Sequence, residues 1–376
     1  MSHLFSGNCC KMACISAFAL ASLSSCMKDD LTSCPPAKVS LSFDYTYNVK
    51  EADAFSAEVK NLNVYVFDEN GKFFDTYTES ADKFETGHKM DITDLNKGKY
   101  TFVCLARDKQ AVATRADGED DETEFSFTQL IPGVSTIDDL QEEMGKKDGE
   151  ETVNAKQFTA LYTAQTSVDY EGKDVASKLS LMKCTKTYRI VMLPYENDQE
   201  GFTPENFDVR IKGSAALLDC NGDKVKNKPI TYLPYDEKIV TNKSGETEVE
   251  GEMIDKALVY DLSSSRMFER SDDATATYGS QEYDDKRIVI TDKRINKVVF
   301  DHSLPWFLAL CGERADKAWD SQEYLDRQDH YVLTFYVPSS KTSDSYNLSA
   351  KIKVNGWVLN LQDTDLGGGS KKEEQK

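Results

Sequence analysis

The feature that most restricts the fold is a strict alternation of apolar and polar residues near the start of the chain. In "VSLSFDYTYNV", apolar or aromatic side chains occupy every second position from Val39 to Val49. Successive side chains of a β-strand point to opposite faces, so this pattern predicts a strand with one buried face. The chain is therefore expected to build a sheet that covers a core.

Turn and cap signals organise the rest of the first half. Asn70-Gly71 lies between two β-prone runs, and an Asn-Gly pair with apolar flanks is a strong hairpin signal. The later stretch "STIDDLQEEMG" predicts a short helix, which Ser135 or Thr136 caps and Gly145 ends.

The second half repeats the β pattern. "RIVITDKRINKVVF" and "DHYVLTFYV" supply strands, and "SLPWFLALCG" predicts a helix with Pro305 in its first turn. The polar, turn-rich stretch "PYENDQEGFTPEN" indicates a linker near residue 198. The sequence thus predicts an all-β fold of two antiparallel β-sandwich domains with small helical insertions, over 39–198 and 199–366.

One stretch near the end of the chain combines acidic, basic and aromatic residues. In "EYLDRQDHYVLTF" the apolar side chains are expected to pack inside the second sandwich, and Asp326 is expected to pair with its neighbour Arg327. A partner surface formed by the same residues is the alternative.

The N-terminal segment has the layout of a secretory signal. Lys11 precedes an apolar or small-residue run from Met12 to Leu23, and no acidic residue occurs before Asp29. The run is shorter than the roughly 20 apolar residues that a membrane-spanning helix needs. Residues 1–25 are therefore predicted to be a signal peptide.

The end of this signal indicates a lipid attachment site. "LSSC", which ends at Cys26, resembles the lipobox of bacterial lipoproteins, in which the cysteine becomes the first mature residue and carries the lipid. Several acyl chains on Cys26 would hold the protein on a membrane without a spanning helix, with residues 26–38 as a tether. The alternative is an ordinary signal cut nearby, with Cys26 incidental.

Charge and cysteine content exclude several kinds of site. The chain has 65 acidic and 45 basic residues, a net charge of -20, which argues against nucleic-acid binding. Five cysteines remain beside Cys26 after signal removal, an odd number without C-x-x-C spacing, so neither a zinc site nor a full disulfide framework is predicted. Single thiols, buried by default, are expected at Cys34, Cys104, Cys184, Cys220 and Cys311, and a chance disulfide among them is the alternative.

Catalytic signatures are missing from the sequence. No H-E-x-x-H, G-x-S-x-G or Walker-type motif occurs, and acidic pairs such as Asp138-Asp139 are typical of solvated surface. "DENG" and "DCNGDK" lack the full ligand series of a calcium loop, so they are interpreted as turns. We therefore predict no enzyme activity, no metal and no cofactor.

Several stretches, in order along most of the mature chain, resemble the FimB-like fimbrial subunit and anchor proteins of the Bacteroidales. They are "CMKDDLTSCP", "FDYTYN", "VYVFDENGKF", "GKYTFVCLA", "LSSSRMF", "QEYLDRQDHYVLTFYV" and "IKVNGWVLNL". The resemblance implies two transthyretin-like sandwich domains, lipidation at Cys26 and joining of subunits by donor-strand exchange. It also implies that Lys28, Asp29 and Asp30 form an export signal to the cell surface; a solvated tether is the alternative.

The predicted function is a structural fimbrial component that is lipid-anchored at the outer membrane and anchors or terminates the fimbria. The implied partners are other fimbrial subunits, both fimbrillin and accessory proteins. The tail 367–376, "GGGSKKEEQK", has no apolar residue to fill a neighbour's pockets, so we expect this chain to accept a strand or cap an end.

A surface glycan-binding lipoprotein with β-sandwich modules is the alternative function. That function needs exposed aromatic platforms. The three tryptophans are Trp306, Trp319 and Trp357, and apolar neighbours predict burial of the first and the last.

Overall fold

The structure is a computed structural model that describes residues 36–109, 126–148, 151–194, 201–225, 228–241, 248–249, 252–253, 256–269, 285–313, 317–337, 351–354 and 357–360. The chain divides into two units, Met1–Ala37 and Lys38–Lys376, and every helix and strand given below lies in the second unit.

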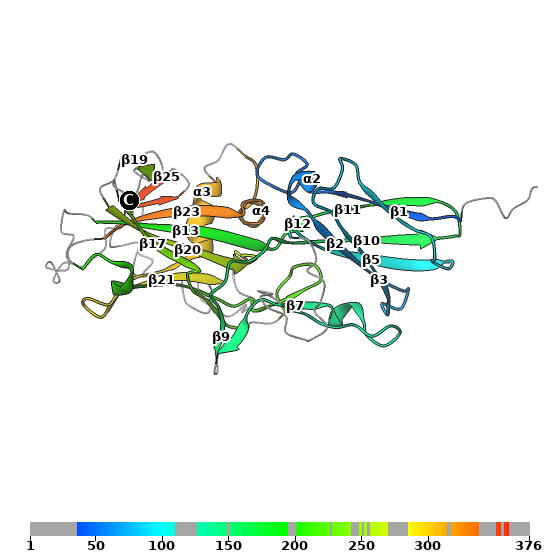
Figure 1. Ribbon diagram of the computed structural model, residues 1–376, viewed down its shortest axis with the longest axis horizontal. Coiled ribbons are helices and arrows are strands. Elements are labelled where there is room, and N and C mark those ends of the chain that lie inside the picture. Colours follow the sequence, from blue (N-terminus) through cyan, green and yellow to red (C-terminus); the bar gives the residue numbers. More distant parts are fainter. Residues whose placement is uncertain are drawn as a thin grey trace, which may run out of the picture. The chain divides into compact units, whose positions relative to one another are not determined.

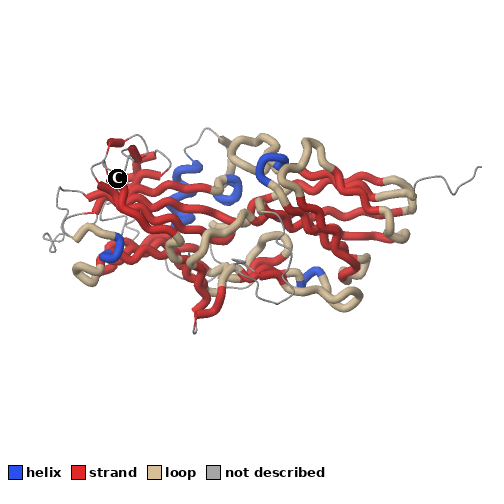
Figure 2. Tube along the Cα trace, in the orientation of Figure 1, coloured by secondary structure: helices blue, strands red, loops and turns tan. Residues whose placement is uncertain are grey.

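The first sandwich consists of a three-stranded and a five-stranded sheet (Figures 1 and 2). The three-stranded sheet has the order β11 (Val175–Ser180), β1 (Val39–Asp44) and β4 (Lys89–Ile92). The five-stranded sheet has the order β12 (Met182–Lys183), β10 (Leu161–Tyr170), β5 (Gly98–Arg107), β2 (Asn61–Phe67) and β3 (Phe73–Ser80). The short helix α2 (Phe55–Glu58) follows β1 in the chain.

The alternation that predicted the first strand is present in β1, but the strand ends at Asp44 and not at Val49, since a turn follows at residues 48–50. Val39, Leu41 and Phe43 are at most 4% exposed, whereas Ser40 and Ser42 are half-buried. The predicted Asn-Gly hairpin is also confirmed, because β2 and β3 pair antiparallel around Gly71 at φ +69°. Glycine suits this position because it adopts positive φ without steric cost.

The second sandwich pairs two six-stranded sheets around one apolar core. One sheet has the order β17 (Asp236–Thr241), β20 (Lys256–Ser265), β13 (Thr185–Pro194), β23 (His330–Val337), β24 (Lys351–Val354) and β25 (Trp357–Asn360). The other has the order β22 (Lys297–Ser303), β21 (Lys286–Asp292), β14 (Phe207–Gly213), β16 (Ile230–Tyr232), β9 (Glu151–Asn154) and β8 (Lys146–Asp148).

The predicted all-β class with two sandwiches is confirmed, but the sheets are mixed and not wholly antiparallel. β1 runs parallel to β11, β13 parallel to β23, and β9 parallel to β16. Parallel neighbours need a long crossover, and in each pair long stretches of chain separate the two strands. β13 precedes the expected boundary near residue 198, yet it pairs with β20 and β23, which follow that boundary.

The segment from 126 to 148 is where the helix prediction was wrong. In place of the predicted helix over 135–145, the chain forms a single 3-10 turn, η2 (Ile137–Asp139), and then the strand β7 (Gln141–Glu143). Thr136 caps η2 as predicted, with Asp139 completing a capping box. β7 pairs with β6 (Ser126–Phe127) and β15 (Leu217–Asp219), so contacts with a distant strand override the local helical pattern.

Two further helices belong to the second sandwich. The predicted helix is α3 (Leu304–Glu313), with Pro305 in its first turn, and Phe307 and Leu308 lie in the core. The sequence reading missed α4 (Ser321–Arg327), which Asp320 caps by accepting a hydrogen bond from the Glu323 backbone N–H. The small remaining elements are η3 (Pro204–Asn206), β18 (Glu248–Val249) and β19 (Glu252–Met253). No helix in the described residues is long and apolar enough to cross a membrane.

Candidate functional site

The residues predicted to attach the lipid and direct export lie outside the described residues. These are Cys26, Lys28, Asp29 and Asp30, and the polar tail 367–376 lies outside as well. Trp357 is in β25, but its side chain is among those that the structure does not describe. The described residues begin at residue 36, within the predicted tether, and β1 follows directly after the tether.

The first strand, β1, is the central strand of its sheet. On one side it pairs in parallel with β11, with Val39 opposite Val175. On the other side it pairs antiparallel with β4, with Leu41 opposite Met90. Backbone groups on both sides of β1 are therefore used, and its apolar face is buried in the sandwich.

Polar contacts fix the start of β1 to both neighbours. The Lys38 backbone N–H donates to the Asp174 carboxylate at 3.0 Å, and the Lys38 ammonium donates to Asp91 at 2.6 Å. The Ser40 hydroxyl also donates to Asp91 at 2.5 Å. The hydrogen bond from Lys38 lowers the pKa of Asp91 below its ordinary value. Because the pair is solvent-exposed, it defines register more than it adds stability.

This arrangement has a defined chemical consequence. Loss of β1 would expose the inner backbone edges of β11 and β4 together with an apolar groove between them. Such a groove can be filled by any extended segment with apolar side chains at alternate positions. In the described structure β1 occupies this position between β11 and β4.

A second cluster joins the loop after β1 to α4. The Arg327 guanidinium lies 4.2 Å from the ring centroid of Tyr47 and 5.0 Å from that of Trp319, and it binds Glu323 at 2.7 Å. Glu51 accepts hydrogen bonds from the Lys317 ammonium at 2.7 Å and from the Trp319 indole N–H at 3.3 Å. Trp319 is therefore engaged within the protein.

Several ionisable groups in the second sandwich are buried and structural. Lys186 is fully buried and donates to the backbone carbonyls of Asp326 and Gln328 at 2.7 and 2.8 Å. Burial lowers the pKa of Lys186 to about 8. Arg266 and Asp326 form a buried ion pair beside it. None of these three residues lines the hollow described below.

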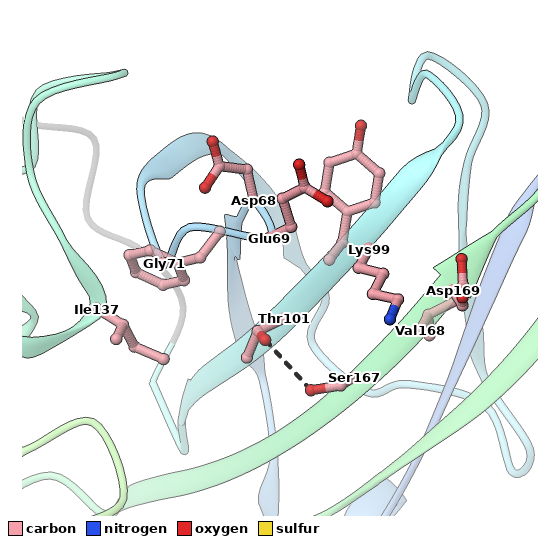
Figure 3. A pocket seen from close by; sticks show the side chains of 11 residues that line it. Asp68, Glu69, Gly71, Lys99, Thr101, Ile137, Ser167, Val168 and Asp169 are labelled. Carbon is pink, nitrogen blue, oxygen red and sulfur yellow. Dashed lines mark hydrogen bonds between the residues drawn. The ribbon is translucent and has the colours of Figure 1, made fainter.

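A hollow of about 470 Å³ lies between the β2–β3 turn and the outer face of β5 and β10 (Figure 3). The hydroxyl groups of Thr101 and Ser167 lie 3.2 Å apart across the two strands, and Lys99 and Asp169 form a register pair two positions further along. Asp68 and Glu69 line the turn side. The two aromatic rings in the lining, Phe67 and Tyr100, are 0% and 7% exposed, so neither gives this hollow the stacking platform that the glycan-binding alternative requires.

The two Asp-x-Asn-Gly stretches are turns, as interpreted from the sequence. Asp68 accepts hydrogen bonds from the backbone N–H groups of Asn70 and Lys72, at 2.8 and 2.9 Å. Asp219 does the same for Asn221 and Asp223. Among the described residues, no group of three or more His, Cys, Asp or Glu side chains is placed to hold a metal ion.

Three of the five cysteines that follow Cys26 fall within the described residues, and all three are buried free thiols. They are Cys104, Cys184 and Cys220. Burial raises the pKa of each thiol. Cys34 and the side chain of Cys311 lie outside the described residues.

The sequence reading missed the roles of Arg266 and Arg327. It paired Asp326 with Arg327, whereas the structure pairs Asp326 with Arg266 and Arg327 with Glu323. Had α4 been recognised, the spacing of Glu323 and Arg327 by four residues would have indicated that pair.

Fold and site together define the class: an all-β protein of two sandwiches, whose first strand follows the N-terminal segment and lies at the centre of a sheet. The model of the Mfa2 family, fimbrillin-A associated anchor proteins Mfa1 and Mfa2, matches residues 31–363. The chain therefore belongs to this family of fimbrial anchor proteins. The resemblance stated from the sequence is confirmed at this level.

Solved structures support the same fold. A candidate polysaccharide-binding protein from Bacteroides thetaiotaomicron is 26% identical with a TM-score of 0.67, and the match covers 88% of this chain and 99% of that one. A candidate adhesin from Bacteroides ovatus is 22% identical with a TM-score of 0.67, covering 87% and 96%. The fimbrial anchor protein Mfa2 from Porphyromonas gingivalis is 16% identical with a TM-score of 0.59, covering 87% and 99%. No curated protein sequence matches the chain.

Proposed function

We propose that this chain is a lipid-anchored structural component of a fimbria at the outer membrane, where it anchors or terminates the fimbria. Membership of the fimbrillin-A associated anchor family supports a fimbrial role. The proposal includes no catalytic role and no cofactor. The observation that carries it is that the predicted tether, residues 26–38, leads directly into the central strand β1.

Because the tether and β1 are one continuous segment, the lipid and the strand between β11 and β4 are kept or lost together. If β1 were cut away, the lipid on Cys26 would leave with it, and the groove between β11 and β4 would open. If β1 stays, the groove stays filled and the body stays attached to the membrane. A molecule that retains its lipid is therefore closed at this position, as a membrane-side end of a fimbria must be.

A neighbouring subunit can then pair only at a free edge. Among the described strands, β3, β17 and β22 are sheet edges with one ladder partner each. Open backbone groups at such edges accept an added strand. We propose that an incoming strand adds at an edge of this kind, and that the polar tail 367–376 is not donated.

The anchor is tested by comparing two cysteine variants. Cys26→Ala is expected to abolish incorporation of a labelled fatty acid and to release fimbriae into the medium. The matched Cys34→Ala variant is expected to do neither. Immunogold labelling of intact cells gives the readout, and fimbriae that remain cell-bound in Cys26→Ala would refute the anchor role.

The export signal is tested separately from the lipid. Replacing Lys28, Asp29 and Asp30 together by Ala is expected to retain the lipid but to protect the protein from protease added to intact cells. Unchanged protease sensitivity would show that these residues are only a solvated tether.

Retention of β1 is tested with a covalent lock. Ser40 and Asp91 are register partners on β1 and β4 and already touch, so Ser40→Cys with Asp91→Cys can form a disulfide between the strands. We expect locked molecules to hold as many fimbriae as the wild type. Loss of fimbriae on oxidation, restored by reduction, would show that β1 must leave and would overturn this part of the proposal.

A further inference from the structure

The turn at residues 131–134 presents aliphatic side chains to solvent. Ile131 and Val134 are 58% and 63% exposed, the largest fractions of any large hydrophobic side chain in the described residues. Pro132 and Gly133 lie between them and are exposed as well. We refer to residues 131–134 as the apolar turn.

Hydrogen bonds hold the apolar turn in one conformation. The Ile131 carbonyl accepts from the backbone N–H groups of Val134 and Ser135, at 3.1 and 3.0 Å, and the Ser135 hydroxyl accepts from the Ile131 N–H at 3.0 Å. Gly133 donates to the Phe73 carbonyl, and Phe73 donates back to Ser135, both at 2.8 Å. The Lys72 ammonium binds the Val134 carbonyl at 2.8 Å.

Such a backbone is preorganised for binding. The β2–β3 hairpin and the residues after the turn fix it before any partner arrives, so ordering it on association costs little. Exposed aliphatic groups on a fixed backbone gain free energy when they enter an apolar recess.

The charges around the apolar turn are mainly acidic. The turn joins the hairpin through Lys72 and Thr136, which form a β-bridge, and through the Ile137 N–H, which donates to Gly71. The exposed acids on these two segments are Glu69, Asp75, Asp138 and Asp139. The ammonium of Lys72 is already bound to the turn itself.

We propose that the apolar turn is a docking knob for another protein, whose surface offers an apolar recess with a rim of Lys or Arg side chains. Charge complementarity selects this occupant. Membrane-binding segments carry basic residues beside their apolar ones, and the acidic rim is the opposite. A second copy of this chain is disfavoured because each copy carries a net charge of -20. The docking knob is a different kind of contact from the strand addition proposed above, and it covers the edge of β3 only at Phe73.

The test is a photo-cross-linking amino acid placed at Val134 in the full chain and activated on intact cells. The matched control places it at Val298, another exposed aliphatic position at 51% exposure, on β22. We expect a protein adduct from Val134 and not from Val298, with the cross-linked peptide of the partner apolar and flanked by Lys or Arg.

Two changes near the probe report on the two halves of the proposal. Ile131→Ser is expected to lower the adduct yield roughly tenfold, because the complex loses an aliphatic side chain that would be buried on binding. Asp138→Lys is expected to lower it several-fold, with a weaker dependence on salt than the wild type.

Three other outcomes would overturn the docking knob, and a fourth would separate it from the proposed function. An adduct between two copies of this chain would identify a self-contact, and an absence of any protein adduct would leave the knob without a partner. Binding of a Cys26→Ser chain to phosphatidylethanolamine–phosphatidylglycerol vesicles that depends on Ile131 would identify a membrane contact. A basic-rimmed partner that is not a fimbrial subunit would support the knob while counting against the fimbrial function.

Discussion

Arg266 donates two hydrogen bonds to the carboxylate of Asp326, from Nε at 2.7 Å and from Nη2 at 2.8 Å, inside the second sandwich. Arg266 follows β20 and Asp326 lies on α4, so the pair joins a sheet to the helix that covers its core. Lys186 donates to the Asp326 carbonyl and supports the same residue from β13. This bidentate pair fixes where α4 packs.

Removing the acidic partner should therefore be costly. Asp326→Asn is expected to lower the free energy of unfolding by about 3–5 kcal/mol, because it leaves the Arg266 charge without its buried counter-ion. Urea unfolding of the purified body measures this. Asp208→Asn is the control, since Asp208 pairs with Arg210 at the surface, and its loss should stay below about 1 kcal/mol. Equal stability of the two variants would contradict a structural role for Asp326.

Gly222 is expected to be intolerant of any side chain. It has φ +74°, and an added Cβ would collide with the sulfur of Cys184. Gly87 has φ +76° but open space around it, so Gly87→Ala isolates the backbone cost of about 1–2 kcal/mol. Gly222→Ala should cost about 1–3 kcal/mol more, because the core there is overpacked. Thermal unfolding of both variants checks this, and equal melting temperatures would show that Cys184 moves aside freely.

The sequence could supply what local chemistry decides. The alternation in β1 was enough to predict a strand, and the Asn-Gly pair at Gly71 was enough to predict a hairpin, because strand period and positive φ are properties of a few adjacent residues. The helix expected around Thr136 failed because Leu140 and Met144 are spaced as on a helix, yet they are buried in two different cores. Pairing with β15, far along the chain, determines that segment.

In the candidate site too, features set by adjacent residues could be predicted and features set by distant strands could not. β1 was predicted as a strand, but its central place depends on β11 and β4, which single-sequence patterns cannot rank as neighbours. Arg327 was misassigned because adjacent residues on a helix do not face each other, and α4 had not been recognised. The roles of Cys26 and of the export residues remain predictions, since they lie outside the described residues.

Glu142 gives the protein a specific dependence on pH. Its side chain is 1% exposed, and its Oε1 has no hydrogen-bond partner in the described residues. Burial and the nearby Asp219 raise the pKa of Glu142 well above 4.5, against the opposing effect of Arg107. The folded state thus keeps a proton that the unfolded state releases, so stability falls as pH rises from the unfolded pKa towards the folded one.

Glu142→Gln should remove this loss. We expect a higher melting temperature than wild type at pH 8, because the wild-type unfolded state is stabilised there by ionisation of Glu142. At pH 4 we expect little difference, because the carboxyl is largely protonated in both states. The adjacent Glu143→Gln is the control, because Glu143 is exposed on the same strand, and it should follow the wild-type profile. A Glu142→Gln profile parallel to the wild type across this range would contradict burial as the cause.

The contacts of Arg327 should determine how firmly the loop after β1 is held. Its guanidinium donates to the carbonyls of Thr46 and Asn48, both at 3.4 Å, while it stacks against Tyr47. Arg327→Lys keeps the charge but loses the planar, forked donor set, so we expect amide hydrogen exchange to accelerate at residues 46–51. A loss of about 1.4 kcal/mol would correspond to tenfold faster exchange there.

Exchange in β1 should remain unchanged in the same variant, because its ladders with β4 and β11 do not involve Arg327. Arg210→Lys, at a surface ion pair of the second sandwich, provides the control and should alter neither segment. If exchange in β1 rose together with that of the loop, α4 would be contributing to retention of the first strand. The proposed anchor would then depend on both sandwiches. Unchanged exchange at residues 46–51 would contradict the role of Arg327, because the loop's own hydrogen bonds would be enough to hold it.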